Sequence, residues 1–179
     1  MRLKNTPRFP RNRVLGCIQD NQLLYEYGKE VARQCKEIGV QINFAPVADV
    51  DINPRNPVIN TRSFGGDPKN VAQKVVAYSR GLEDGGVLSV AKHFPGHGDT
   101  EVDSHKALPV LNFDRARLDS IELYPFKEVI HAGVGRLWPV IWKFLNWERI
   151  RLHCLLMLLT ICFVGSWVSE DWCLQMHSK

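Results

Sequence analysis

The chain has 179 residues, a formal net charge of +4 and a hydrophobic content of 45%. This length predicts one domain or a large part of one, with enough apolar residues for a buried core. Because the basic residues are spread along the chain rather than gathered in a stripe, we expect no nucleic-acid partner. The five cysteines form no CxxC pair and are odd in number, which argues against a disulfide framework or a zinc ribbon.

The sequence predicts neither a signal peptide nor a membrane span. Residues 1–13 are basic and polar and lack the apolar stretch of a signal peptide. The sequence leaves two localisations open, cytoplasmic or, if a signal precedes this segment, periplasmic. Residues 152–168 contain an apolar run of about 14 residues, shorter than the roughly 20 that span a bilayer. We therefore expect no membrane partner, and nothing in the sequence indicates a protein partner.

The composition changes near residue 136. All five tryptophans lie after Leu137, whereas twelve of the thirteen glycines lie before Arg136. This contrast predicts two regions of different character, residues 1–135 and residues 136–179.

The first region begins with an alternation of helix and strand. Apolar residues recur at helical spacing over residues 23–38, and Gly39 follows as a stop signal. Residues 40–47 then alternate and predict a strand, whose end carries Asp49 and Asp51.

The same alternation continues along the chain. Asp67 and Pro68 predict the start of a second helix, which ends at Gly85 and Gly86 before a strand over residues 87–91. Asp114 is expected to cap a further helix, and Pro125 to restart it toward Ile130. Strands joined by helices run parallel in an α/β fold. The periodicity does not choose between a (β/α)8 barrel and a doubly wound sheet.

Residues 92–109, which directly follow the second predicted strand, form the most informative segment. Half of the six histidines (His93, His97 and His105) lie here with Asp99, Glu101 and Asp103. Polar groups that follow a parallel strand are typical of an active-site loop. The alternative is a solvated connection without a function.

A zinc site is a second alternative for this segment. His93 and His97 have the i, i+4 spacing of two ligands on one helical face, and Asp99, Asp103 or His105 would complete the ligand set. Pro95, Gly96 and Gly98 argue against a helix here. We therefore expect neither a metal nor a cofactor, and keep a zinc-dependent hydrolase using His93, His97 and His105 as the alternative function.

Three motifs together resemble glycoside hydrolase family 3, in its β-N-acetylglucosaminidase branch. They are Asn43-Phe-Ala-Pro-Val-Ala-Asp-Val-Asp51, Asn60-Thr-Arg-Ser-Phe-Gly65 and the segment 92–109. The resemblance extends over about residues 1–135 and implies a TIM (β/α)8 barrel. Relative to that pattern, this chain is expected to be a partial barrel, incomplete at both ends.

The resemblance also implies roles for individual residues. Arg62, Lys92 and His93 would bind the hydroxyl groups of the sugar in the cleavage subsite. His105 would be the general acid/base, and Asp103 would orient it, because a histidine that titrates near neutral pH can give and then take a proton. The expected substrate is a carbohydrate with a terminal β-linked N-acetylhexosamine, hydrolysed with retention.

The nucleophile motif of the family, an apolar strand that ends in Thr-Asp or Ser-Asp, is absent after residue 135. A shifted reading frame restores this motif. In that frame each codon consists of the third base of one codon and the first two bases of the next, and the codons of residues 171–178 can then encode a strand that ends in Thr-Asp. The same offset over residues 137–145 permits Met-Ala-Gly-His-Leu-Glu-Val-Pro, another strand of the family. We interpret residues 136–179 as an out-of-frame tail, against the alternative of an ordinary hydrophobic extension.

The chain as written is therefore expected to be inactive, because it has no nucleophile in this frame and the two-step mechanism needs both partners. A non-catalytic barrel fragment, which folds poorly or only binds sugar, is the remaining alternative.

Overall fold

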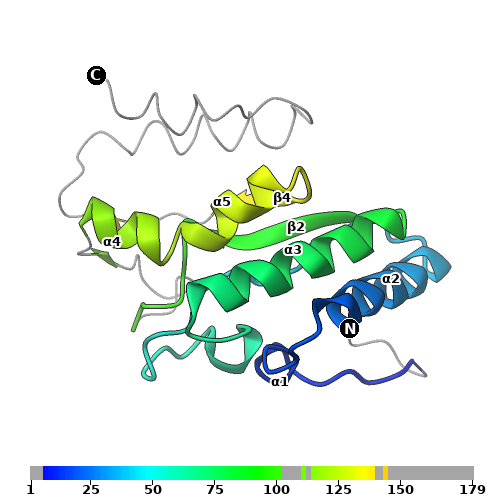
Figure 1. The fold of residues 1–179 in the computed structure, drawn as a ribbon, viewed down its shortest axis with the longest axis horizontal. Coiled ribbons are helices and arrows are strands. Elements are labelled where there is room, and N and C mark those ends of the chain that lie inside the picture. Colours follow the sequence, from blue (N-terminus) through cyan, green and yellow to red (C-terminus); the bar gives the residue numbers. More distant parts are fainter. Residues whose placement is uncertain (1–5, 102–109, 112–113, 140–142, 145–179) are drawn as a thin grey trace.

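The computed structural model describes residues 6–101, 110–111, 114–139 and 143–144, which form an α/β fold (Figure 1). The helices are α1 (Asn12–Leu15), α2 (Asn21–Glu37), η1 (Asn60–Arg62), α3 (Pro68–Asp84), α4 (Arg115–Ser120) and α5 (Tyr124–His131). The strands are β1 (Ile42–Asn43), β2 (Leu88–Phe94), β3 (Val110–Leu111), β4 (Arg136–Pro139) and β5 (Lys143–Phe144).

The main sheet is parallel, as predicted, with the strand order β1, β2, β4. β3 and β5 form a separate parallel pair. Residues 40–47, predicted as one strand, run alongside β2, but only Ile42–Asn43 form a regular strand. Pro46 interrupts the regular pairing because it has no N–H to donate. Pairing resumes beyond it: the Ala48 amide donates to the Lys92 carbonyl at 2.7 Å and the Lys92 amide to the Pro46 carbonyl at 3.0 Å. The segment before Asp49 is therefore held against β2.

The predicted helix starts are confirmed by their caps. The Asp67 carboxylate accepts hydrogen bonds from the amides of Lys69 and Asn70, with Pro68 in the first turn of α3. Asp114 accepts from the Arg117 amide at the start of α4. A side-chain oxygen at this position pairs an amide that would otherwise lack a helical acceptor.

Helices α2 and α3 approach closely enough for backbone contact, and α3 lies along β2 with α2 and α5 on its two sides (Figure 1). Gly28 and Gly81 make this possible. A Cβ atom on Gly81 would lie 2.1 Å from the Tyr25 carbonyl oxygen, and one on Gly28 would lie 2.6 Å from that of Tyr78. Any side chain at either position would force the two helices apart.

The core lies between this helical layer and the sheet. Its members are fully or nearly fully buried apolar side chains, among them Leu24, Val31, Val71, Val75, Leu82, Ala91 and Phe126. Along β2, Leu88 is exposed, the next three residues, Ser89, Val90 and Ala91, are buried, and the last three, Lys92 to Phe94, are partly exposed. The rings of Phe44 and Trp138, from the segments on either side of β2, meet edge to face at a centroid distance of 4.8 Å and remain exposed.

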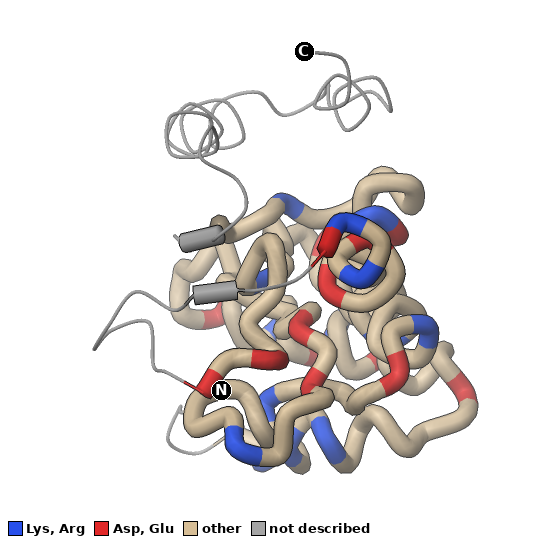
Figure 2. Tube along the Cα trace, turned by 90° about the vertical axis from the view of Figure 1, so that its left-hand side faces the viewer, with Lys and Arg blue, Asp and Glu red and all other residues tan. Residues whose placement is uncertain are grey.

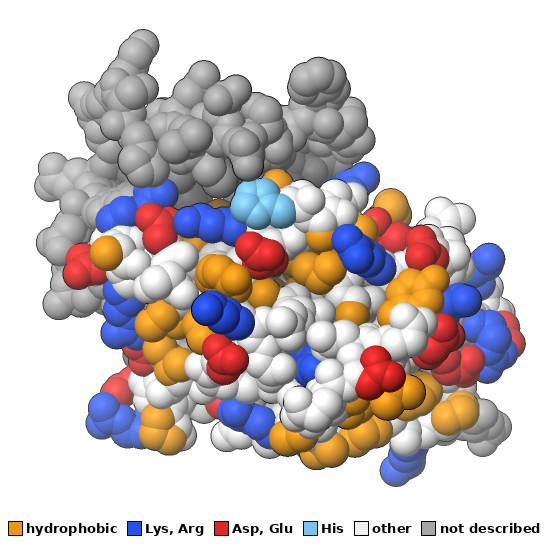
Figure 3. Space-filling model, in the orientation of Figure 1, with side chains coloured by type: hydrophobic (Ala, Val, Ile, Leu, Met, Phe, Trp, Pro, Cys, Tyr) orange, Lys and Arg blue, Asp and Glu red, His pale blue; other side chains and the backbone are white. Residues whose placement is uncertain are grey.

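The charges are interspersed over the described part of the chain. Figure 2 shows acidic and basic residues interspersed along the trace, and the face in Figure 3 carries both kinds. Within the described residues, no helix is both long and apolar enough to cross a membrane. The apolar run 152–168 lies outside the described residues.

Candidate active site

A buried aspartate lies at the centre of the site. The Asp49 side chain is fully buried, and its Oδ2 lies 2.6 Å from Nδ1 of His93. The same carboxylate accepts hydrogen bonds from the His97 amide at 2.7 Å and from the His93 amide at 3.2 Å to each oxygen. Asp49 thus joins the segment that follows β1 to the end of β2 and to the loop beyond it.

The three predicted sugar-binding residues meet beside this aspartate. Lys92 and His93 are near the end of β2, where the sheet delivers them to its carboxyl edge. Arg62 comes from the end of η1, and its guanidinium lies 3.5 Å from Nε2 of His93. All three side chains are partly exposed, so they form a polar surface over the fully buried carboxylate.

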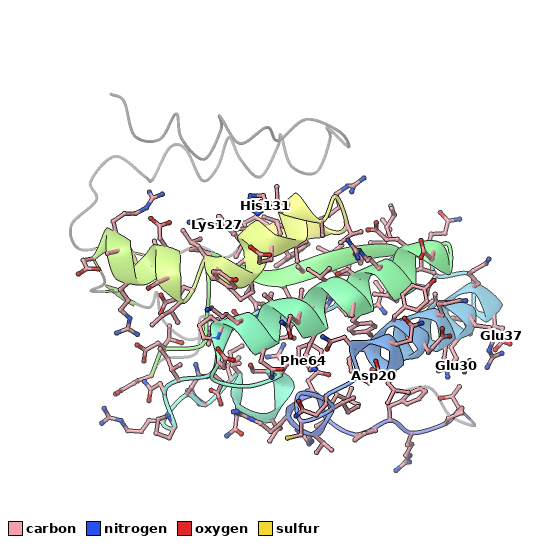
Figure 4. The ribbon with its side chains drawn as sticks, in the orientation of Figure 1. Asp20, Glu30, Glu37, Phe64, Lys127 and His131 are labelled. Carbon is pink, nitrogen blue, oxygen red and sulfur yellow. The ribbon has the colours of Figure 1, made fainter. Side chains whose placement is uncertain are left out.

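Arg62 is held by hydrogen bonds to helix α1 and to the segment that precedes η1. Its carbonyl accepts from the Asn12 side chain at 2.7 Å, and its guanidinium donates to the Val58 carbonyl at 3.2 Å. The next residue, Ser63, is buried and donates from Oγ to the Asp49 carbonyl at 2.6 Å. Phe64, labelled in Figure 4, is buried in the core and fixes the chain that follows.

The loop after β2 is packed against the same aspartate segment. The His97 side chain is buried, with Nδ1 2.6 Å from Oγ1 of Thr100, and its carbonyl accepts from the Asn56 amide group at 2.6 Å. A Cβ on Gly98 would lie only 1.7 Å from the Val50 carbonyl oxygen. The loop therefore lies in direct backbone contact with the residue that follows Asp49.

Helix α4 contacts the far side of this loop. The Arg117 guanidinium pairs with Asp99 and lies 3.4 Å from the buried Glu122 carboxylate. Burial raises the pKa of Glu122, while the positive charge of Arg117 opposes the shift. Gly96 lies against Glu122, where a Cβ would come within 2.9 Å of the Glu122 Cβ.

Burial lowers the pKa values of two basic side chains near the aspartate, Lys92 and His97. Burial is the main cause that lowers the pKa of Lys92, and the charge of Arg62 adds to it while Asp49 opposes it. Burial likewise lowers the pKa of His97, again opposed by Asp49. The arrangement provides two cationic donors and an imidazole, a set suited to neutral, hydroxyl-rich ligands.

The comparisons with known proteins agree with this geometry. The model of the glycosyl hydrolase family 3 N-terminal domain matches residues 1–163. The chain belongs to this family.

Among its relatives, β-hexosaminidase A of Pseudoalteromonas piscicida is 47% identical over 103 residues, which are 58% of this chain and 17% of that protein. The structure of a family 3 β-N-acetylglucosaminidase from Paenibacillus sp. FPU-7 matches with a TM-score of 0.76 and 42% identity, over 80% of this chain and 27% of that one.

NagZ from Neisseria gonorrhoeae in complex with N-trifluoroacetyl-D-glucosamine matches with a TM-score of 0.74 and 32% identity, over 82% of this chain and 45% of that one. The same protein has also been solved with a zinc ion. The family 3 chain therefore spans less than half the length of each of these relatives.

The structure brings Arg62, Lys92 and His93 together, as the sequence predicted. The predicted acid/base pair, His105 and Asp103, lies outside the described residues, so their roles stay predictions. For the zinc alternative, the described residues contain no group of three or more metal-ligating side chains that could hold a metal ion. The carboxylate of Asp99, one of the suggested ligands, pairs with Arg117 instead.

Several residues of the site were not predicted from the sequence. The sequence places Asp49 at a strand end and within the family motif 43–51 but assigns it no role, and it assigns no role to Asn56, Thr100 or Arg117. The available signal for Asp49 was an acidic residue between the apolar Ala48 and Val50, since a carboxylate in such a run must find buried donors.

We expect His97 to make stability depend on pH. Because its pKa is lower in the folded chain than the usual 6.5, the unfolded state takes up the proton first. The free energy of unfolding should therefore fall as the pH is lowered below about 6.5. The check is urea unfolding between pH 7.5 and 5.5 for the wild type and for His97→Asn, whose curve should be flatter.

The matched control is His131→Asn. This histidine is exposed on α5 (Figure 4), with 53% of its side chain accessible, and its removal should keep the wild-type slope. Parallel curves for the wild type and His97→Asn would show that His97 does not cause the pH dependence.

Proposed function

We propose that this family 3 chain comes from a retaining glycosidase that hydrolyses terminal β-linked N-acetylhexosamine residues, with N-acetylglucosamine as the preferred sugar. The observation that carries the proposal is the meeting of Arg62, Lys92 and His93 over the buried Asp49 carboxylate. The relatives named β-hexosaminidase and β-N-acetylglucosaminidase support the choice of sugar. The complex of NagZ with N-trifluoroacetyl-D-glucosamine supports a carbohydrate ligand.

The fold proposed for the described region is part of a TIM (β/α)8 barrel. Three parallel strands with helices packed on one face, and polar side chains at the carboxyl ends of the strands, support this proposal. In such a barrel the exposed face with Phe44, Leu88 and Trp138 would point inward. The active site would lie at the end of the strands where Lys92 and His93 are found.

The proposed mechanism divides the work between two groups of residues. Arg62, Lys92 and His93 bind the sugar hydroxyls and hold the anomeric carbon in place. His105, oriented by Asp103, gives a proton to the leaving oxygen and later takes one from water. The nucleophile is not in this frame, so the 179-residue chain itself is expected to bind sugar without turning it over.

We also propose that residues 136–179 are an out-of-frame tail that follows a base lost near the codons for Gly135 and Arg136. The offset that restores two motifs of the family in order supports this. The family match extends past this boundary to residue 163, and β4 at Arg136–Pro139 pairs with β2, so the boundary at residue 135 stays a prediction. Sequencing the gene around these codons tests it, and a continuous frame without a missing base would contradict it.

A zinc-dependent hydrolase is the second candidate, and the observation in its favour is the zinc complex of NagZ. His93 and His97 supply two imidazoles with ring centroids 5.9 Å apart. Against it, the described residues contain no group of three or more side chains that could hold a metal ion. The two candidates differ in whether removal of metal abolishes activity.

We expect the frame-restored, full-length enzyme to hydrolyse an aryl β-N-acetylglucosaminide much faster than the matching aryl β-glucoside, judged by kcat/KM. Dialysis against a chelator should leave the rate unchanged. Preference for the glucoside would contradict the proposed sugar, whereas loss of activity with the metal and recovery with added zinc would favour the zinc-dependent hydrolase.

In the same enzyme, His105→Ala should reduce kcat by roughly 100- to 10,000-fold for substrates with basic leaving groups, the usual contribution of general acid catalysis. The loss should be smallest for activated aryl leaving groups, which depart without a proton. A series of aryl glycosides of graded leaving-group pKa measures this.

Lys92→Ala is the matched control, because a residue that binds the sugar contributes to the ground state and the transition state alike. It should raise KM for all leaving groups to a similar extent. Equal losses of kcat across the series for His105→Ala would remove His105 from the acid/base role.

A further inference from the structure

The Asp49 carboxylate is fully enclosed in the site, and it contacts one ring nitrogen of His93. The side chain of Asp49 has no exposed surface, whereas that of His93 keeps 14% of its surface accessible. The 2.6 Å contact joins Oδ2 to Nδ1, and two amide hydrogen bonds from His93 and His97 fix the carboxylate in place. Asp49 thus contacts His93 from the side away from solvent.

This geometry determines which nitrogen of His93 carries the proton. A carboxylate only accepts hydrogen bonds, so Nδ1 must be the protonated nitrogen. In the neutral ring Nε2 then carries the lone pair and acts only as a hydrogen-bond acceptor. Arg62, which can only donate, lies 3.5 Å from Nε2 and favours the same form.

We propose that Asp49 is a positioning residue that fixes His93 in its Nδ1–H form and thereby presents Nε2 to the substrate as a hydrogen-bond acceptor. The inference rests on the proposed function, because it takes the ligand to be a sugar. A sugar hydroxyl both donates and accepts. Arg62 and Lys92 satisfy its oxygen, and the acceptor at His93 satisfies its hydrogen, which a site made only of donors would leave unpaired.

The decisive experiment uses the 179-residue chain labelled with 15N-histidine. Long-range 15N–1H correlation spectra at pH 8 show which ring nitrogen is protonated, and His93→Gln assigns the signals by their loss. The wild type should show His93 protonated at Nδ1 alone. A ring protonated at Nε2, or at both nitrogens, would overturn the proposal without requiring any variant of Asp49 to fold.

Two variants then test the role of Asp49 in binding. Asp49→Asn should shift His93 toward the Nε2–H form and weaken binding of N-acetylglucosamine at least about tenfold, the effect of one lost hydrogen bond. Asp51→Asn removes a carboxylate on the same segment that pairs with Arg13 and should change neither result. Equal effects of the two variants on His93, or unchanged sugar binding by Asp49→Asn, would show that Asp49 has only a structural role.

The outcome separates this inference from the proposed function. If the wild-type spectra show the Nδ1–H form but N-acetylglucosamine does not bind, the sugar assignment fails while Asp49 remains the residue that orients His93. If the sugar binds and His93 is protonated at Nε2, the proposed function stands and the positioning role of Asp49 fails.

Discussion

The candidate site depends on the burial of one carboxylate. Removing a carboxylate from water costs several kcal/mol unless donors inside the protein replace the lost hydration. For Asp49 these donors come from residues 93 and 97, more than forty positions along the chain. The segment after β1 and the loop after β2 therefore cannot separate without leaving this group unpaired. The positions of Lys92 and His93 are a consequence of that constraint.

The loop after β2 is held by contacts of different kinds. Backbone packing at Gly98, the hydrogen bond from Asn56 to the His97 carbonyl, and the ion pair between Asp99 and Arg117 come from three separate parts of the chain. Such redundancy keeps side chains in a fixed geometry even when one contact is weakened. A binding site gains from this because little conformational freedom remains to be lost when a ligand arrives.

The sequence was sufficient to predict those features that depend on local signals. Asp67, Pro68 and Asp114 fixed the helix starts, and the alternation of elements indicated parallel strands. The convergence of Arg62, Lys92 and His93 followed from motifs rather than from periodicity. The bonds of Asp49 and the pairing of Arg117 with Asp99 could not be predicted, because they join residues distant in sequence whose approach depends on packing of the whole domain. Strand 40–47 was predicted too long, since Pro46 interrupts the regular ladder.

The glycine at position 98 has a consequence for the interpretation of sequence alignments. It lies within the most recognisable motif of the chain, among residues that would ordinarily be assigned to catalysis. Glycine is required at this position for a steric reason, because no side chain fits against the Val50 carbonyl. Invariance at this position across an alignment would therefore record the shape of the backbone and carry no information about which sugar is bound or how it is cleaved. A relative that lost its activity but kept its fold would retain this glycine.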